Sequence, residues 1–315
     1  MRYRQLGGSG LTVSELGLGC NNFGMRLDAD ASAVVVRAAL DHGITHFDTA
    51  HSYGGGRSEE YLGAALGGRR DEVVIATKFG SPRERQASDP AAGSLTNVLR
   101  SCETSLRRLG TDHIDLYYLH FPDPATPLDE TLAALDDLVR QGKVRYVATS
   151  NMAGWQVAEA QHLARRDHLR RPVACQVEWS LLQRDVEREV VPACRHYRVG
   201  VVPYFPLASG LLTGKYRRGE DFPPDSRLGS GPYFAAMATD ERFDRVEQLR
   251  AVADQQGTSL LSLALGWLLA QDGVPTVLAG ATSPEQVAAN AAAVDQPLPA
   301  DLVAHLTEVL DQPAG

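Results

Sequence analysis

Eight short apolar segments recur along the chain, and longer segments with helical spacing of their apolar residues lie between them. Because a short apolar run bounded by polar turns is typical of a buried strand, we predict strands at residues 16–20, 45–50, 73–79, 114–120, 144–150, 173–179, 200–205 and 274–279. The clearest helical patterns lie at residues 31–41, 95–109, 128–141, 155–165 and 284–293. Ser94 is the expected N-cap of the second of these helices, and Gly110 is its expected stop.

Repeated strand–helix units predict an α/β fold with a parallel sheet, and eight of them in succession favour a closed (β/α)8 TIM barrel. We expect residues 1–315 to form one domain. A doubly wound open sheet is the alternative, although no Gly-x-Gly-x-x-Gly motif follows the first strand. Residues 2–5 and 11–13 predict a β-hairpin at the barrel bottom. Long loops are predicted at residues 81–93 and 217–233.

The chain is acidic, with 39 Asp and Glu residues against 31 Lys and Arg residues and a net charge of −8. This balance argues against a nucleic acid or an anionic membrane as partner. The longest apolar run, residues 260–270, is too short to span a bilayer, and no apolar leader follows the first residues. The four cysteines show no metal-ligand spacing, so we predict idle thiols, no bound metal and a cytoplasmic protein.

Ionisable residues stand at the ends of three consecutive predicted strands. Asp48 lies near the end of the second strand, and Tyr53 follows in the turn after it. Lys78 lies near the end of the third strand, and His120 ends the fourth. Each residue alone has an ordinary explanation, such as a loop cap or a surface charge. Because neighbouring barrel strands bring their C-terminal ends to the face where barrel enzymes perform catalysis, we predict that the four side chains meet there.

These four side chains suit the protonation of an oxygen atom. A tyrosine phenol has a pKa of about 10, and we expect the cation of Lys78 to lower the pKa of Tyr53. Asp48 is expected to hold Lys78 by an ion pair, and His120 to donate a hydrogen bond to a carbonyl oxygen. Such a set can protonate a carbonyl oxygen as hydride arrives at its carbon.

Motifs along the whole chain resemble those of the aldo-keto reductase family. The matching stretches are Gly10-Leu11-Thr12-Val13-Ser14, Leu16-Gly17-Leu18-Gly19, Phe47-Asp48-Thr49-Ala50, Tyr53-Gly54, Ser58-Glu59, Thr77-Lys78-Phe79-Gly80, Leu119-His120, Ser150-Asn151, Gln176, Pro206-Leu207, Leu212-Thr213-Gly214-Lys215-Tyr216, and Gly280-Ala281-Thr282 with Gln286 and Asn290. Members resembling the potassium-channel β-subunits share the Gly-Lys-Tyr stretch and a Pro-Pro-x-Ser-Arg motif, here ending at Arg227. The resemblance implies a TIM barrel with a nicotinamide cofactor, NADPH, extended across its top.

The same resemblance implies functional residues. The implied catalytic tetrad is Asp48, Tyr53, Lys78 and His120. The implied nicotinamide contacts are Ser150, Asn151 and Gln176 on the carboxamide and Tyr204 on the ring. The implied contacts of the pyrophosphate and the adenosine end are Lys215, Gly280, Thr282, Gln286 and Asn290. Further predicted cofactor contacts are Gly19, Cys20, Asn21, Asp48, Phe205, Pro206, Leu207, Ser209, Gly210 and, as a phosphate contact, Arg227.

Two departures from the family pattern bear on specificity. Thr282 stands where many bacterial members carry arginine, and residues 280–290 contain no lysine or arginine. A 2′-phosphate ordinarily takes a guanidinium or ammonium partner, so we expect a weakened preference for NADPH, with NADH possible as cofactor. Asn21 stands where many members have tryptophan or another large residue, which predicts a more polar substrate pocket.

The predicted function is the NADPH-dependent reduction of an aldehyde, ketone or sugar, with Tyr53 as general acid and a small-molecule carbonyl substrate as partner. One alternative is a Schiff-base aldolase that uses Lys78. Another is an NAD(P)H-binding regulatory subunit with low turnover. His120 favours catalysis, because channel-type members tend to have asparagine at that position. The sequence leaves the substrate and self-association open.

Overall fold

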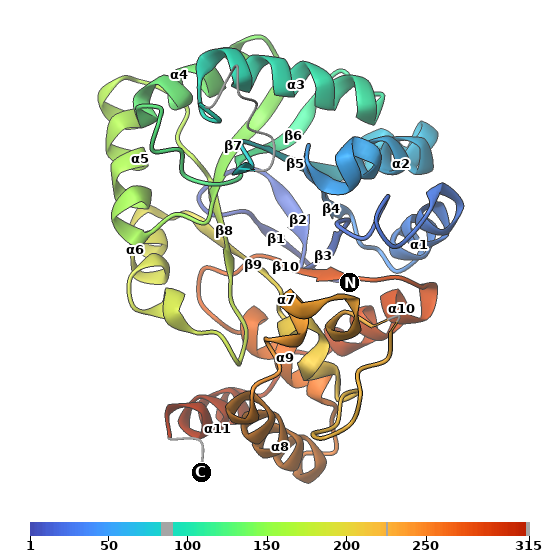
Figure 1. Ribbon diagram of the computed structural model, residues 1–315. Helices are drawn as coiled ribbons and strands as arrows, with labels where there is room; N and C mark the ends of the chain where they lie inside the picture. Colours follow the sequence, from blue (N-terminus) through green and yellow to red (C-terminus); the bar gives the residue numbers. More distant parts are fainter. Residues whose placement is uncertain (83–90, 225, 313–315) are drawn as a thin grey trace.

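Eight parallel strands form the centre of the molecule in the computed structural model, which describes residues 1–82, 91–224 and 226–312 (Figure 1). They are β3 (Leu16–Gly19), β4 (His46–Asp48), β5 (Val74–Phe79), β6 (Ile114–Leu119), β7 (Val144–Ser150), β8 (Ala174–Glu178), β9 (Gly200–Tyr204) and β10 (Val277–Gly280). Their order is β10-β3-β4-β5-β6-β7-β8-β9. Val201 N on β9 donates to Gly273 O ahead of β10 at 2.9 Å. This nearly closed ring confirms the (β/α)8 barrel rather than an open sheet.

The observed strands differ from the predicted ones chiefly at their ends. The segment predicted as a strand at 274–279 begins its ladder only at Val277, because Val274 N donates to Gln271 O in the turn that follows a helix. The second predicted strand, 45–50, is reduced to His46–Asp48, since the chain turns towards Tyr53 immediately afterwards. A run of apolar residues places a strand well but does not show at which residue the strand's hydrogen bonding ends.

Helices surround the barrel in the order expected for repeated strand–helix units (Figure 1). They are α1 (Ala29–Asp41), α2 (Arg57–Leu66), α3 (Leu95–Leu109), α4 (Leu128–Arg140), α5 (Gly154–Arg166), α6 (Val190–Tyr197), α7 (Pro232–Ala235), α8 (Asp240–Gln255), α9 (Leu260–Leu269), α10 (Pro284–Ala293) and α11 (Ala300–Asp311). At α3 the Ser94 side chain accepts from Asn97 N, and Gly110 ends the helix with φ 64°, as predicted. Within the described residues no helix is long and apolar enough to cross a membrane.

The two predicted loops have different outcomes. In the first, residues 83–90 lie outside the described part of the chain. In the second, residues 217–233, the chain makes a short 3-10 turn at Leu228–Ser230, and helix α7 begins at Pro232. Proline at the first helical position has its φ already suited to a helix, which explains where α7 starts.

The N-terminal hairpin covers the end of the barrel at which the strands begin. Strands β1 (Tyr3–Gln5) and β2 (Thr12–Ser14) pair antiparallel. Gly7, in the turn between them, has φ 57°, and a Cβ there would lie 2.5 Å from Val173 O, just ahead of β8. Only glycine fits such a close approach. The predicted hairpin at the barrel bottom is therefore confirmed.

A buried carboxylate ties this hairpin to the barrel. Glu15 is 2 % exposed; its Oε1 accepts from Arg4 Nε at 2.6 Å, and its Oε2 forms an ion pair with Arg2 Nη2 at 2.6 Å. Arg4 also donates to the carbonyl oxygens of Leu269 and Val274, at 2.8 and 3.0 Å. The ion pairs and these backbone contacts hold the hairpin against the segment that leads into β10.

We expect Glu15→Ala to lower the free energy of unfolding by about 1–3 kcal/mol, because two partly buried guanidinium groups lose their anion. Denaturant unfolding at neutral pH measures the change. Glu72→Ala is the matched control, since Glu72 makes an exposed ion pair with Arg69 and should leave stability unchanged. Equal stability of the Glu15 variant and wild type would contradict the assigned role.

Candidate active site

The four residues predicted to meet at the barrel mouth do so. Lys78 on β5 donates from Nζ to Asp48 Oδ1 at the end of β4, at 2.5 Å, and to Thr49 O at 2.8 Å. The same nitrogen lies 5.1 Å from the centre of the Tyr53 ring. His120 directly follows β6, and its ring centre is 5.8 Å from that of Tyr53, edge to face. The structure thus brings the predicted tetrad into one group.

The ammonium of Lys78 is held charged in a fully buried position. Burial by itself lowers the pKa of Lys78, but the charge of Asp48 and the interactions with Tyr53 outweigh burial and raise the pKa above its ordinary value. A lysine in this state is a cation and a hydrogen-bond donor. It is poorly suited to attack a carbonyl as a neutral amine.

The pKa of Tyr53 shifts in the direction opposite to our expectation. Burial raises the pKa of the Tyr53 phenol, and the lowering by Lys78 is smaller than this effect. The sequence could indicate the neighbouring cation but not the depth of burial. The phenol therefore keeps its proton at neutral pH, in the form that a proton donor needs.

Three glycines fix the turn that presents Tyr53. Gly54, Gly55 and Gly56 have φ of 60°, 68° and 100°, a region that residues with side chains rarely adopt. A Cβ on Gly54 would lie 2.8 Å from Phe23 O, too close for any other residue without a backbone shift. The turn after Tyr53 therefore requires glycine, because a side chain would be strained or would clash there.

A buried ion pair braces this turn from behind. Arg108 on α3 donates from Nη1 to His51 O at 3.1 Å and to Glu59 Oε2 at 3.2 Å. Glu59, fully buried in α2, also accepts from Thr77 Oγ1 on β5 at 2.7 Å. Glu59 thus joins the turn to the strand that carries the lysine, a role that was not predicted for the Ser58-Glu59 motif.

The residues expected at the nicotinamide lie beside the tetrad. Gln176 Nε2 donates to Asp48 Oδ2 at 2.8 Å, a contact that the sequence did not indicate. Ser150 Oγ donates to Gln176 O at 3.0 Å. Asn151 Nδ2 donates to the backbone oxygen of His120 at 2.9 Å, and Asn151 Oδ1 accepts from Tyr204. The four predicted carboxamide and ring contacts therefore form one hydrogen-bonded group.

Bare backbone lies at the adjacent C-terminal ends of β3 and β10, at Gly19 and Gly280, and we call this surface the trough. Gly19 and Gly280 are partners in the strand register, and a Cβ on either would meet no atom closer than 3.5 Å. Beside them, Asn22 is 4 % exposed and donates to Ala281 O at 3.3 Å. Its Oδ1 has no hydrogen-bond partner among the described residues. Space together with an unpaired buried acceptor fits an elongated polar ligand. Cys20 and Asn21, also predicted contacts, follow Gly19 directly.

The loop after β9 has an unusual backbone. Phe205, Ala208 and Ser209 have φ of 50°, 45° and 58°, and Gly210 has 97°. Pro206 and Leu207 complete the loop. A Cβ on Gly210 would lie 3.4 Å from Lys215 Nζ, so the lysine ammonium closes on a backbone that carries no side chain. The N–H groups of Ala208 and Gly210 donate within the loop, to Phe205 O and Leu207 O at 2.9 and 2.8 Å, so the ammonium of Lys215 is the group here that suits a phosphate.

The residues predicted at the adenosine end lie together on the segment from β10 into α10. Thr282 donates from its backbone N to Gln286 Oε1 at 2.9 Å, and Ser283 caps α10. Asn290 is buried one turn further along the helix. Thr282, Gln286 and Asn290 carry no charge, in agreement with the absence of lysine and arginine from residues 280–290.

Arg227 reaches over the trough from the loop ahead of α7. Its Nη2 donates to Asn21 Oδ1 at 3.3 Å, and its guanidinium lies 5.9 Å from the Phe205 ring and 5.0 Å from the Phe234 ring. Burial lowers the pKa of Arg227, and the charge of Arg26 lowers it further. The guanidinium of Arg227 at this position fits an anionic ligand. The sequence did not single out Arg26, since its loop after β3 carries no motif at that residue.

Within the described residues, no group of three or more His, Cys, Asp or Glu side chains is placed to hold a metal ion. The chemistry available at the barrel mouth is that of a buried cation, a phenol, an imidazole and a trough suited to a dinucleotide. Such a set can bind a nicotinamide cofactor and protonate an oxygen beside it.

Known proteins share this organisation. The model of the Aldo/keto reductase family matches residues 15–311. A protein named "Uncharacterized oxidoreductase YrpG" from Bacillus subtilis is 36 % identical, covering 100 % of this chain and 98 % of its own. A "Probable voltage-gated potassium channel subunit beta" from Arabidopsis thaliana is 36 % identical over 94 % of this chain and 92 % of its own. A "Probable aldo-keto reductase 1" from Glycine max is 38 % identical over 86 % and 78 %.

Fold, site and relatives define an NAD(P)H-dependent oxidoreductase on an eight-stranded barrel that acts on carbonyl groups. The chain belongs to the aldo/keto reductase family.

A histidine beneath the site makes the stability of the protein pH-dependent. His46 on β4 is fully buried, with Nδ1 3.3 Å from Thr276 Oγ1. Burial lowers the pKa of His46 from 6.5 to about 4. The unfolded chain therefore binds a proton that the folded chain refuses as the pH falls through the range between these two values.

We expect His46 to account for a loss of about 2 kcal/mol in the free energy of unfolding between pH 7 and pH 5. His46→Gln should remove this contribution to the pH dependence, even if its stability at pH 7 is lower. Denaturant unfolding at the two pH values tests the slope. His305→Gln, at an exposed position on α11, is the control and should retain the wild-type slope. A wild-type slope in His46→Gln would show that His46 is not the group responsible.

Proposed function

We propose that this protein reduces aldehydes or ketones, sugars among them, to alcohols, with NADPH as the preferred cofactor and Tyr53 as general acid. The observation that carries the proposal is the buried ammonium of Lys78, in contact with Asp48 and beside the phenol of Tyr53. A cation in this position stabilises the phenolate that remains after the proton is given away.

The steps follow from the positions of the side chains. When bound, the nicotinamide cofactor would supply the hydride. A carbonyl oxygen between Tyr53 and His120 can accept hydrogen bonds from both, which orients the carbonyl and draws electron density to its oxygen. The Tyr53 proton moves to that oxygen as the carbonyl carbon is reduced, and Lys78 stabilises the phenolate. Asp48, an anion in direct contact, keeps Lys78 charged throughout.

Gln176 connects the cofactor side with the proton donor. Its Nε2 holds the second oxygen of Asp48, while Ser150 and Asn151 pack beside it. We propose that these three residues hold the carboxamide and that Tyr204 covers the ring. We further propose that the residues along the trough, the loop after β9 and the start of α10 hold the rest of the dinucleotide.

A preference for NADPH rests on Arg227. The Thr282–Gln286 pair offers only neutral groups, which bind phosphate less strongly than cations do. Arg227 is partly buried, and the described hydrogen-bond acceptor of its side chain is the neutral amide of Asn21. A phosphate beside Arg227 would offer its guanidinium charge-assisted hydrogen bonds. We therefore propose NADPH as the better cofactor and NADH as a usable one.

The alternatives from the sequence are supported less well. A Schiff-base aldolase needs a neutral lysine, whereas the pKa of Lys78 is raised and its ammonium is bound by Asp48. A regulatory subunit with low turnover has the support of the relatives named potassium-channel β-subunits. A steady-state assay with a generic aldehyde separates that function from catalysis.

We also propose that residues 1–315 form one domain and that it acts in the cytoplasm. The hydrophobic core runs continuously from the barrel strands to helix α11. All four cysteines are free buried thiols, in keeping with a reducing compartment.

Tyr53→Phe should reduce turnover at least about a hundredfold, the scale expected for a positioned proton donor. The dissociation constant for NADPH should change little, because only the hydroxyl is removed. Single-turnover reduction of an aldehyde, followed by NADPH absorbance, measures the effect on chemistry. Tyr61→Phe, on the partly buried side of α2, is the control and should behave as wild type. Full activity of Tyr53→Phe would refute the assignment.

Arg227→Ala should weaken NADPH binding by about 1.5–3 kcal/mol and NADH binding far less, because only NADPH carries the 2′-phosphate. Fluorescence titration with both cofactors measures the two dissociation constants. Arg217→Ala, an exposed residue of the same loop, is the control. Equal losses for both cofactors would place Arg227 at a phosphate that the two share, and no loss would remove it from the cofactor site.

A further inference from the structure

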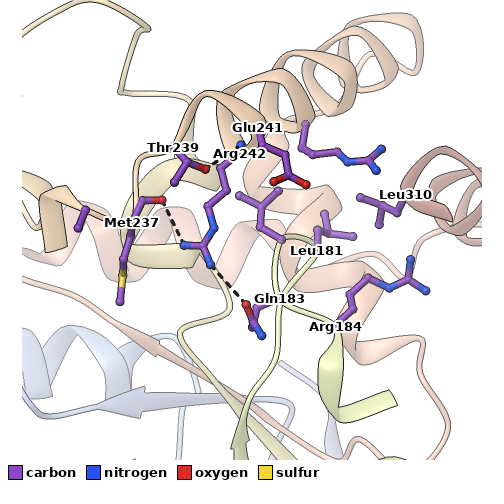
Figure 2. Close-up of a pocket in the computed structure, with 11 residues that line it drawn as sticks. Leu181, Gln183, Arg184, Met237, Thr239, Glu241, Arg242 and Leu310 are labelled. Carbon is purple, nitrogen blue, oxygen red and sulfur yellow. Dashed lines mark hydrogen bonds between the residues drawn. The ribbon is translucent and has the colours of Figure 1, made fainter. Parts of the chain in front are cut away.

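A cavity of about 520 Å³ lies between the loop after β8, the start of α8 and the end of α11 (Figure 2). No residue proposed above for catalysis or cofactor binding lines it. One wall is apolar and is formed by Leu181, Leu182 and Leu310. The charged side chains around it are Arg184, Glu241, Arg242 and Arg245. The cavity therefore combines an apolar surface with a cationic one.

Arg242 makes two long hydrogen bonds to its described partners, and Glu178 is a carboxylate whose charge acts on it. Arg242 Nη1 donates to Met237 O at 3.2 Å and Nη2 to Gln183 Oε1 at 3.4 Å, and Figure 2 shows Arg242 extending between these two residues. Both distances are longer than the usual N–H···O distance of about 2.9–3.0 Å, and both acceptors are neutral. An anion in the cavity would offer Arg242 shorter, charge-assisted hydrogen bonds.

The neighbouring charges narrow the choice of anion. Arg184 is already neutralised by Glu187 and Asp311, each at 2.8 Å. Arg245 donates to neutral acceptors, among them Val309 O at 3.0 Å. The carboxylate of Glu241 lines the same cavity and opposes a multiply charged ligand. The balance favours one negative charge rather than a phosphate.

We propose that this cavity binds a small amphipathic monocarboxylate. Its carboxylate lies on the guanidinium of Arg242, and its hydrocarbon chain packs against Leu181 and Leu310. Burial of each methylene against such a wall should tighten binding about fourfold, so affinity grows with chain length until the cavity is full.

Met237 links this site to the cofactor loop. Its carbonyl oxygen accepts from Arg242, and its Sδ accepts from Ser209 Oγ at 3.2 Å. Ser209 has φ 58° and belongs to the loop after β9. A carboxylate that draws Arg242 away from Met237 changes the support of that loop. The site thus modulates cofactor affinity, a consequence that rests on the cofactor placement proposed above.

Calorimetric titration of the NADPH-saturated protein tests the binding site. The probes are octanoate, its neutral analogue octanamide, and octylammonium. Octanoate should bind at least about tenfold more tightly than octanamide, the gain expected from one charge-assisted contact, and octylammonium should not bind. Equal affinity for octanoate and octanamide would overturn the proposal.

Variants locate the contact. Arg242→Gln should remove the preference for octanoate over octanamide, and Arg242→Lys should recover part of it. Arg165→Gln, at an exposed position on α5, should retain the wild-type preference. Circular dichroism and thermal unfolding confirm that each variant is folded. Octanoate bound at the barrel mouth instead would keep its full preference in Arg242→Gln, and this result would refute the site.

The coupling is measured as the dissociation constant of NADPH with and without saturating octanoate. A change of at least about threefold in wild type, absent from Arg242→Gln, supports the link through Met237. An unchanged constant in a protein that binds octanoate would overturn the link while leaving the site intact. Because neither measurement uses turnover, failure of the carbonyl-reductase proposal would leave both results interpretable.

Discussion

An ammonium group enclosed by protein imposes the strictest constraint on this structure. Removing the charge of Lys78 from water is costly, and the cost is offset only while Asp48 stays at hydrogen-bond distance. Asp48 in turn divides its two oxygens between Lys78 and Gln176, so β4, β5 and β8 must converge at one point. A strand shifted in register would leave a buried charge without its partner. The electrostatics of the barrel mouth therefore require the observed strand register.

Different parts of the molecule provide rigid support and ligand contacts. The hairpin and Glu15 close the end at which the strands begin, and Arg108 with Glu59 supports the turn that carries the phenol. These contacts are made by buried carboxylates and glycines that leave little freedom. The ligand-facing loop after β9, by contrast, contains several residues in left-handed conformations, each costing of order 1 kcal/mol. Strain is concentrated where the protein is proposed to grip a flexible dinucleotide.

The sequence predicted the barrel and the four mouth residues because both depend on local patterns. Apolar runs mark buried strands, and polar residues at their ends must face one rim. The contact of Gln176 with Asp48 could not be predicted in the same way, since it joins residues on strands that meet only across the closed ring. The predicted direction of the shift in the Tyr53 pKa was wrong, because burial has a larger effect on this pKa than the neighbouring charge of Lys78. Arg26 and Arg242 were missed because their significance lies in the packing of loops from distant parts of the chain.

The paired glycines Gly19 and Gly280 have a consequence for how this chain can vary. An added methyl group at either position would meet only ordinary van der Waals distances, so folding tolerates it. The same methyl group would project into the trough and take up room there. Variation at these positions can narrow the trough but cannot widen it, because no residue is smaller than glycine. Substitutions at Gly19 and Gly280 can therefore only reduce the room in the trough. A protein that lost its ligand in this way would remain well folded.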